Sequence, residues 1–216
     1  MLKGNPPAAG TLAGIDVSHF QQDIDWAPVG ASGVNYCFIK ATEGVSLADE
    51  KFSRNWQAAS EARVLRGAYH LFQPSDSVTA QSDFFLRTVS PLQPGDLPPV
   101  LDLENPTAWT SVPPQDRAQL AIEWLQAVEQ GLGVRPLIYL SPSFASETLA
   151  NSPLLARFQV WLADYTSAPA PSIPKPWDEW TFWQHTARGT IPGIAVLVDL
   201  NRFNGTIEEL KILKAR

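Results

Sequence analysis

Eight short apolar segments, spread over a chain of 216 residues, constrain the fold more than any other feature. Each is apolar along its whole length instead of alternating with polar residues, and most are rich in β-branched or aromatic side chains. Strands of this kind form a sheet that is covered on both faces, so helices must pack against it. The segments are LAGIDVS (12–18), NYCFIKAT (35–42), LRGAYHLF (65–72), LPPVLDLEN (97–105), RPLIYLS (135–141), FQVWLADY (158–165), WTFWQHT (180–186) and AVLVDLN (195–201).

Helical patterns lie between several of these segments. The clearest covers residues 113–133, with a proline start, apolar residues at helical spacing and a Gly-Leu-Gly stop. Further helices are predicted over 47–63, 77–89, around 144–150 and 206–213, whereas the proline-rich stretch 167–177 has no amphipathic pattern. Strands joined by helices favour parallel connections. The sequence therefore predicts an α/β fold, an irregular (β/α)8 TIM-like barrel with some helices missing or shortened, and an open doubly wound sheet is the alternative.

Length and composition set the remaining bounds. The hydrophobic content of 44% and eight tryptophans fit one large domain, which we expect at residues 12–216 after a loose N-terminal leader at 1–11. A net charge of -6 gives no electrostatic case for binding nucleic acid or an anionic membrane. The single cysteine, Cys37, allows no intrachain disulfide, and the chain shows neither a signal-peptide core nor a bilayer-spanning run. We expect a monomer.

Acidic residues stand at the ends of several predicted strands. In a (β/α)8 barrel the catalytic groups sit at the C-terminal ends of the strands, where the loops form the active face. Asp16 ends the first segment, Asp102 and Glu104 end the fourth, and Asp199 ends the eighth. Other polar or aromatic residues end the remaining segments: Tyr69, His70, Tyr139, Trp161, Asp164, Gln184 and His185.

The segment VLDLEN places two carboxylates one residue apart. Side chains alternate along a strand, so Asp102 and Glu104 would share one face while the leucines between and before them face the helices. Two carboxyl groups about 6 to 7 Å apart repel when both are ionised, and apolar surroundings add a desolvation cost. One pKa should rise, and we expect the neighbouring charge of Asp102 to keep Glu104 protonated. A carboxylic acid beside a carboxylate is the pair that glycoside hydrolysis uses.

Each candidate also has an ordinary structural interpretation. A D-x-E pattern occurs on strands with a solvated face, Asp16 could cap a turn, and Asp199 could form an ion pair with Arg202. The aromatic candidates could be core residues, and Lys40 and Glu43 could form an ion pair at the barrel rim. The three histidines, which could compose a metal site, are His19, His70 and His185. They lack the H-x-H and H-E-x-x-H spacings, so hydrogen-bonded structural roles are favoured, and we expect no metal and no cofactor.

Several motifs in a fixed order carry a family likeness. They are GIDVSHFQQDIDW, FIKATEG, GAYHLFQP, PPVLDLEN, PLIYLSPSF, VWLADY and FWQHTARGTIPGIAVLVDLNRF, between residues 12 and 206 or so. Together they make the chain resemble glycoside hydrolase family 25, the Chalaropsis-type lysozymes. The resemblance implies an irregular β/α barrel and hydrolysis of the β-1,4 bond between N-acetylmuramic acid and N-acetylglucosamine, with bacterial peptidoglycan strands as the partner.

The resemblance also implies roles for individual residues. Glu104 would be the general acid and base, and Asp102 would stabilise an oxazolinium intermediate formed by the N-acetyl group of the substrate. Asp16 and Asp199 would be the other two catalytic acids. The substrate-binding positions would be Tyr69, Tyr139, Trp161 and Gln184. Such an enzyme acts on the cell wall outside the cytoplasm, either secreted or released as a phage endolysin. A catalytically silent peptidoglycan-binding module is the alternative function, and a metal-dependent barrel hydrolase is a weaker one.

Overall fold

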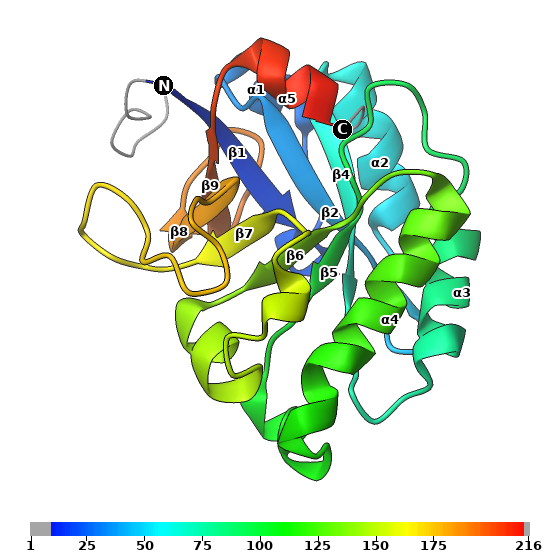
Figure 1. Ribbon diagram of the computed structural model, residues 1–216. Coiled ribbons are helices and arrows are strands. Elements are labelled where there is room, and N and C mark those ends of the chain that lie inside the picture. The colour runs from blue at the N-terminus through cyan, green and yellow to red at the C-terminus, as the bar shows by residue number, and fades with distance from the viewer. Residues whose placement is uncertain (1–9, 214–216) are drawn as a thin grey trace.

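A computed structural model describes residues 10–213 and shows a closed barrel (Figure 1). Within these residues the barrel order is β1-β9-β8-β7-β6-β5-β4-β2, and β1 closes the ring by pairing with both β2 and β9. This closure confirms the predicted barrel and excludes the open sheet. The strands are β1 (Thr11–Val17), β2 (Tyr36–Glu43), β4 (Leu65–Leu71), β5 (Val100–Asp102), β6 (Leu137–Leu140), β7 (Val160–Ala163), β8 (Phe182–Gly189) and β9 (Val198–Asn204), and the short β3 (Leu47–Ala48) extends the sheet beside β2.

The predicted leader, residues 1–11, falls mostly outside the described residues, because the description starts at residue 10. Thr11 already belongs to β1 and lies opposite Asn204 of β9.

The last strand runs in the direction opposite to the one that the sequence predicted. β9 is antiparallel to both of its neighbours, β8 and β1, whereas the other ring pairings are parallel. The prediction of uniformly parallel connections was therefore wrong at this point. A parallel return needs a crossover of about a dozen residues, and the segment 190–197 between β8 and β9 is shorter than that and contains no helix. The chain reverses instead, and the beginning of β9 lies at the same end of the barrel as the ends of the other strands.

Helices cover only part of the barrel (Figure 1). The long predicted helix is α4 (Pro114–Leu132), and Gly133, with a left-handed φ of 66°, caps its end. α4 packs against α3 (Val78–Val89). The connection from β7 to β8 contains no helix, so the expectation of missing and shortened helices is confirmed. No helix among residues 10–213 is long and apolar enough to cross a membrane. The other helices are α1 (Trp26–Ala31), which the sequence did not predict, α2 (Phe52–Glu61), α5 (Ile207–Ile212) and a π-helical turn at Phe144–Thr148.

Two hydrophobic clusters hold the barrel together. One lies between the strands and the helices and includes Leu101 and Leu103. The other fills the barrel interior, with aromatic side chains from β2, β7, β8 and β9 packed ring against ring. Gly14 makes room for this packing, because a Cβ atom at that position would lie 2.2 Å from the ring of Tyr36. A filled interior closes the bottom of the barrel, so a substrate can enter only at the mouth.

Candidate active site

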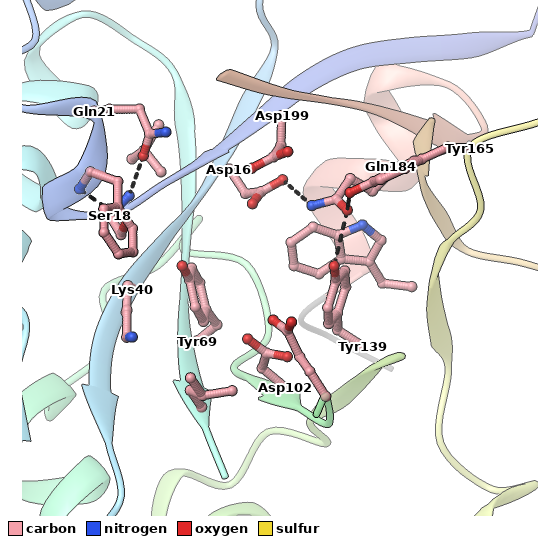
Figure 2. A pocket seen from close by; sticks show the side chains of 15 residues that line it. Asp16, Ser18, Gln21, Lys40, Tyr69, Asp102, Tyr139, Tyr165, Gln184 and Asp199 are labelled. Carbon is pink, nitrogen blue, oxygen red and sulfur yellow. Dashed lines mark hydrogen bonds between the residues drawn. The ribbon is translucent and has the colours of Figure 1, made fainter. Parts of the chain in front are cut away.

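A cavity of about 350 Å³ opens at the end of the barrel where most of the strands finish. All eight site residues predicted from the sequence line it, and Figure 2 shows most of them converging from different strands. The structure therefore brings these eight residues together, and their roles stay a prediction. The cavity is lined by Asp16, Val17, Ser18, Phe20, Gln21, Lys40, Tyr69, Leu71, Asp102, Glu104, Tyr139, Trp161, Tyr165, Gln184 and Asp199.

The D-x-E pair stands at the end of β5. Its leucines pack into the helix layer as predicted, and Val100, Asp102 and Glu104 face the barrel side. The strand ends at Asp102, earlier than the sequence suggested, and Asn105 adopts a left-handed backbone with a φ of 54°. As a result the two carboxyl groups differ in exposure: Asp102 is buried at 5% exposure, whereas Glu104 is exposed. Glu104 is the member of the pair that a bound ligand can reach from solvent.

The buried position of Asp102 changes its acidity. Burial is the main cause that raises the pKa of Asp102 well above its usual value, and the nearby charge of Glu104 and a hydrogen bond with Glu104 add to it. The sequence argument considered repulsion between the two carboxyl groups and did not foresee that Asp102 is the more buried of the two. The Oδ1 atom of Asp102 has no hydrogen-bond partner among the described residues. Burial and the charge of Glu104 therefore favour the protonated form of Asp102.

Asp16 and Asp199 form a second acidic pair across the cavity. They lie opposite each other in the antiparallel ladder between β1 and β9, and Figure 2 shows their carboxyl groups facing each other. Burial and then the charge of Asp199 raise the pKa of Asp16 to about 8. Burial and then the charge of Glu104 raise the pKa of Asp199 to about 6. Because Glu104 acts on both aspartates, all four predicted acids belong to one electrostatic unit.

Gln184 links the second acidic pair to the aromatic wall. Its Nε2 donates to Asp16 Oδ2 at 3.0 Å, and its Oε1 accepts from Tyr139 Oη at 2.9 Å and from Tyr165 Oη at 2.7 Å. These bonds fix the orientation of the amide and of both phenol groups. Gln184 thus positions two aromatic side chains and one acid at the same time.

Asn201 and Trp161 extend this network into the barrel interior. Asn201 Nδ2 donates to Asp16 Oδ2 at 2.6 Å, and Trp161 Nε1 donates to Asn201 Oδ1 at 2.8 Å. Trp161 is only 2% exposed and stacks on Phe38 with ring centroids 4.7 Å apart. It therefore forms the floor of the cavity and anchors the residues above it.

The comparisons with known proteins show which family the chain belongs to. The sequence model described as Glycosyl hydrolases family 25 matches residues 15–194. The chain belongs to this family. It is therefore a glycoside hydrolase with the barrel fold of the family.

Individual relatives of this family 25 enzyme cover nearly the whole described barrel. It is 41% identical to "Uncharacterized protein YegX" of Escherichia coli K12 over 95% of this chain and 74% of that protein. It is 32% identical to "Lysozyme M1" of Streptomyces globisporus over 96% of this chain and 73% of that protein. Among solved structures, the bacterial lysozyme from Streptomyces coelicolor superposes with a TM-score of 0.91 at 32% identity, covering 96% of this chain and 98% of that one.

Sequence reasoning missed several residues of this site, among them Phe20, Tyr165 and Asn201. Phe20 and Tyr165 line the cavity and are 71% and 60% exposed, and Asn201 bonds to Asp16 from below. Phe20 and Tyr165 lie just after strand ends, in the motifs DVSHF and LADY, and that position was the available signal. Lys40 was predicted to pair with Glu43 at the rim, and it does so with Nζ and Oε2 2.6 Å apart while also lining the cavity.

The histidines of the enzyme lie apart from one another. His19 Nδ1 lies 2.8 Å from Asp49 Oδ2, and the buried His70 lies between Thr42 and Gln81 at 2.8 and 3.1 Å, as the predicted hydrogen-bonded roles require. His185 packs against a tryptophan on the outside of β8. Within residues 10–213, no group of three or more His, Cys, Asp or Glu side chains is placed to hold a metal ion.

The suggested ion pair between Asp199 and Arg202 does not form. Asp199 lines the cavity, whereas the guanidinium of Arg202 lies over the ring of Trp183, 5.3 Å from its centroid, on the outer side of the barrel. Asp199 is therefore left with its acidic neighbours, which explains the cost of ionising this cluster.

Proposed function

We propose that this glycoside hydrolase is a muramidase that cleaves the β-1,4 bond between N-acetylmuramic acid and N-acetylglucosamine in bacterial peptidoglycan. The single observation that carries the proposal is the cavity at the barrel mouth, where Asp102, Glu104, Asp16 and Asp199 gather with aromatic side chains. The names of two relatives, Lysozyme M1 and the lysozyme of known structure, favour the same substrate.

Glu104 is the proposed general acid. It is the solvent-exposed member of the pair, and its carboxyl group lines the cavity where a glycosidic oxygen would lie. The proton held by the pair passes from Glu104 to the leaving oxygen as the glycosidic C–O bond breaks. In the second half of the reaction Glu104 takes a proton from the attacking water, so the acid is restored.

Asp102 is the proposed stabiliser of the intermediate. In the substrate-assisted route, the acetamido oxygen of the substrate attacks its own anomeric carbon and forms an oxazolinium ring, which water then opens. A buried carboxylate can orient the acetamido N–H and balance the positive charge of this ring. The Oδ1 atom of Asp102, which has no geometric hydrogen-bond partner among the described residues, supports the assignment because it leaves one acceptor for the substrate.

The opposite side of the cavity would bind the sugar. Asp16 and Asp199 are proposed to hold polar groups of the substrate and to set the charge felt by Glu104. Aromatic rings suit the apolar faces of a pyranose, and their edges carry hydrogen-bonding groups. The proposed sugar-binding residues are Tyr69, Tyr139, Trp161 and Gln184.

The wider setting of the enzyme is part of the proposal. We propose that residues 12–216 act as a single catalytic domain, that the protein works as a monomer, and that it acts on the cell wall outside the cytoplasm. The continuous barrel formed by β1 to β9 supports the first of these statements.

The test replaces the proposed acid. Glu104→Gln keeps the shape of the side chain and removes its proton, so release of reducing sugar from purified peptidoglycan should fall at least about a thousandfold, which is within the range of general acid catalysis and transition-state stabilisation combined. Glu123→Gln, at an exposed position of α4, is the matched control and should keep wild-type activity.

Mass spectrometry of the digest identifies the bond that is cleaved. Muramic acid at the new reducing ends supports a muramidase, whereas glucosamine ends or released peptides would overturn the proposal. Near-wild-type activity of Glu104→Gln, at an unchanged melting temperature, would remove Glu104 from the mechanism. Loss of wild-type activity in a chelator would favour the metal-dependent alternative, and binding to peptidoglycan without any cleavage would favour a silent binding module.

A further inference from the structure

A second cavity, of about 480 Å³, lies on the outer side of β8 and β9. We call it the arginine pocket. Its walls combine an indole, an imidazole, two guanidinium groups and several hydroxyl groups, and they come from both strands and from the loop after β7. The pocket is lined by Thr166, Ser167, Ala168, Pro169, Trp183, His185, Thr186, Arg188, Gly189, Leu200 and Arg202.

The two guanidinium groups of the arginine pocket have no acidic partner. Within residues 10–213, no carboxylate forms an ion pair with Arg188 or Arg202, although the protein carries a net charge of -6. Four other arginines contact carboxylates, whereas Arg63, Arg87 and Arg117 form no ion pair among the described residues. Those four are Arg54, Arg66, Arg135 and Arg157.

One guanidinium is held in place before any ligand arrives. Trp183 Nε1 donates to the backbone oxygen of Asp164 at 2.7 Å, which fixes the indole ring, and Arg202 lies over that ring. The positive charge acts on the neighbouring imidazole: burial first and then Arg202 lower the pKa of His185 to about 4. His185 is therefore neutral at pH 7 and offers a hydrogen-bonding nitrogen beside two cations.

The arginine pocket and the catalytic cavity share a wall. Gln184 lines the catalytic cavity, and its neighbours Trp183 and His185 line the arginine pocket because side chains alternate along β8. In the same way, Tyr165 lines the catalytic cavity and its neighbour Thr166 lines the arginine pocket. Asp199 and Leu200 repeat this arrangement on β9. Since these residues stand at the mouth end of the barrel, the arginine pocket lies beside the mouth of the catalytic cavity.

We propose that the arginine pocket binds a carboxylate of the peptide stem that the muramic acid residue of the substrate carries. Arginine recognises carboxylates through two parallel N–H···O bonds, and the exposed Pro169 beside them suits an apolar group of a short peptide. The inference rests on the proposed function, because only a peptidoglycan substrate carries this peptide stem. The acidic catalytic cavity would repel the carboxylates of the stem, whereas the arginine pocket would attract them. Binding the stem here would draw an acidic polymer to an acidic enzyme and set the register of the glycan strand.

A phosphodiester of a wall polymer presents similar oxygen atoms, so the test must separate the two sources. Three substrates do so: polymer-free peptidoglycan with its peptide stems, the same glycan strands after an amidase has removed the stems, and walls that retain phosphodiester polymers. The variants are Arg188→Gln and Arg202→Gln. Arg87→Gln, at an exposed position of α3, is the matched loss of one positive charge.

On stem-bearing, polymer-free peptidoglycan, each pocket variant should lose about tenfold in kcat/KM, mostly through KM, while Arg87→Gln stays at wild type. On stem-free strands all variants should match the wild type, which shows that their catalytic cavity is intact. Because Arg188 is exposed, its replacement also leaves the fold undisturbed, and an unchanged melting temperature checks this.

Equal kcat/KM of pocket variants and wild type on the stem-bearing substrate would overturn the inference. A loss of the same size on stem-free strands would also overturn it, because the arginines would then act on the glycan or on the fold. A loss of kcat/KM confined to walls with phosphodiester polymers would mean that the arginine pocket binds a phosphate group and not the peptide stem. Absence of wild-type cleavage on every substrate would instead be a failure of the proposed muramidase function, and the outcomes are thus distinct.

Discussion

The buried acid Asp16 should make the protein less stable as the pH rises from about 4 to 8. Its pKa is about 8 in the folded protein, against 3.8 for an ordinary aspartate. A group whose folded pKa lies above the unfolded value contributes its full stability below the unfolded pKa and loses it as the pH climbs to the folded pKa. The protonated carboxyl of Asp16 is therefore stabilising at pH 4 and costs free energy at pH 7, where the unfolded chain would release the proton.

The size of this cost follows from the two pKa values. Between pH 3.8 and pH 7 the unfolded carboxyl is ionised while the folded one keeps its proton. Each pH unit in that interval costs about 1.4 kcal/mol, so Asp16 lowers the free energy of unfolding by about 4 kcal/mol at pH 7 relative to pH 4.

Asp16→Asn isolates the effect. The side-chain oxygen of asparagine can still accept the hydrogen bonds from Asn201 and Gln184. Its amide group can donate to Asp199, as the protonated carboxyl group of Asp16 can. The variant should match the wild type near pH 4 and exceed it by up to about 4 kcal/mol at pH 7. Urea unfolding at several pH values measures this, and the difference between the two proteins cancels the titration of distant groups.

Parallel stability curves for wild type and Asp16→Asn from pH 4 to 7 would refute the reasoning. A variant that gains stability on acidification relative to wild type would refute it more strongly, because the sign would then be that of an acid with a lowered pKa. Reducing-sugar release should fall in Asp16→Asn, since the acid is kept at a cost to the fold for its proposed role in the cavity.

Two further predictions concern an exposed aromatic side chain and a crowded glycine. Phe20 lines the catalytic cavity although it is 71% exposed, so Phe20→Ala should raise KM on peptidoglycan about fivefold at unchanged kcat. An unchanged KM would remove Phe20 from the binding surface. A Cβ at Gly14 would lie 2.2 Å from Tyr36, so Gly14→Ala should cost at least about 1 to 3 kcal/mol in urea unfolding, and a smaller loss would mean that the interior can rearrange.

The features that sequence predicted well are those that depend on local alternation. The D-x-E pair could be assigned because one leucine between two acids forces both onto the same face of a strand. The end of strand β5 could not be predicted from the same pattern. Glu104 becomes exposed because β5 stops at Asp102 and Asn105 turns the chain, and the sequence placed the strand end several residues later. The buried member of the pair is thus Asp102, and burial raises its pKa.

The residues that sequence reasoning missed depend on how loops return to the mouth. Phe20 and Tyr165 follow strand ends in the sequence, but nothing local indicates that their rings turn back toward the cavity. Asn201 was missed for a different reason. It looked like the last residue of a strand, whereas it lies inside β9 and supports Asp16 from within the barrel.

The direction of β9 explains how the second acidic pair exists. The rule that catalytic groups stand at C-terminal strand ends located Asp199 correctly, although Asp199 is near the beginning of its strand. Because β9 runs antiparallel, its beginning lies at the mouth, and its register sets Asp199 opposite Asp16. A parallel strand over the same residues would carry Asp199 to the closed end and leave Asp16 without the charge that helps to raise its pKa. Closing the barrel and assembling the acidic cavity are therefore the same structural step, since the strand that completes the ring also delivers the fourth acid.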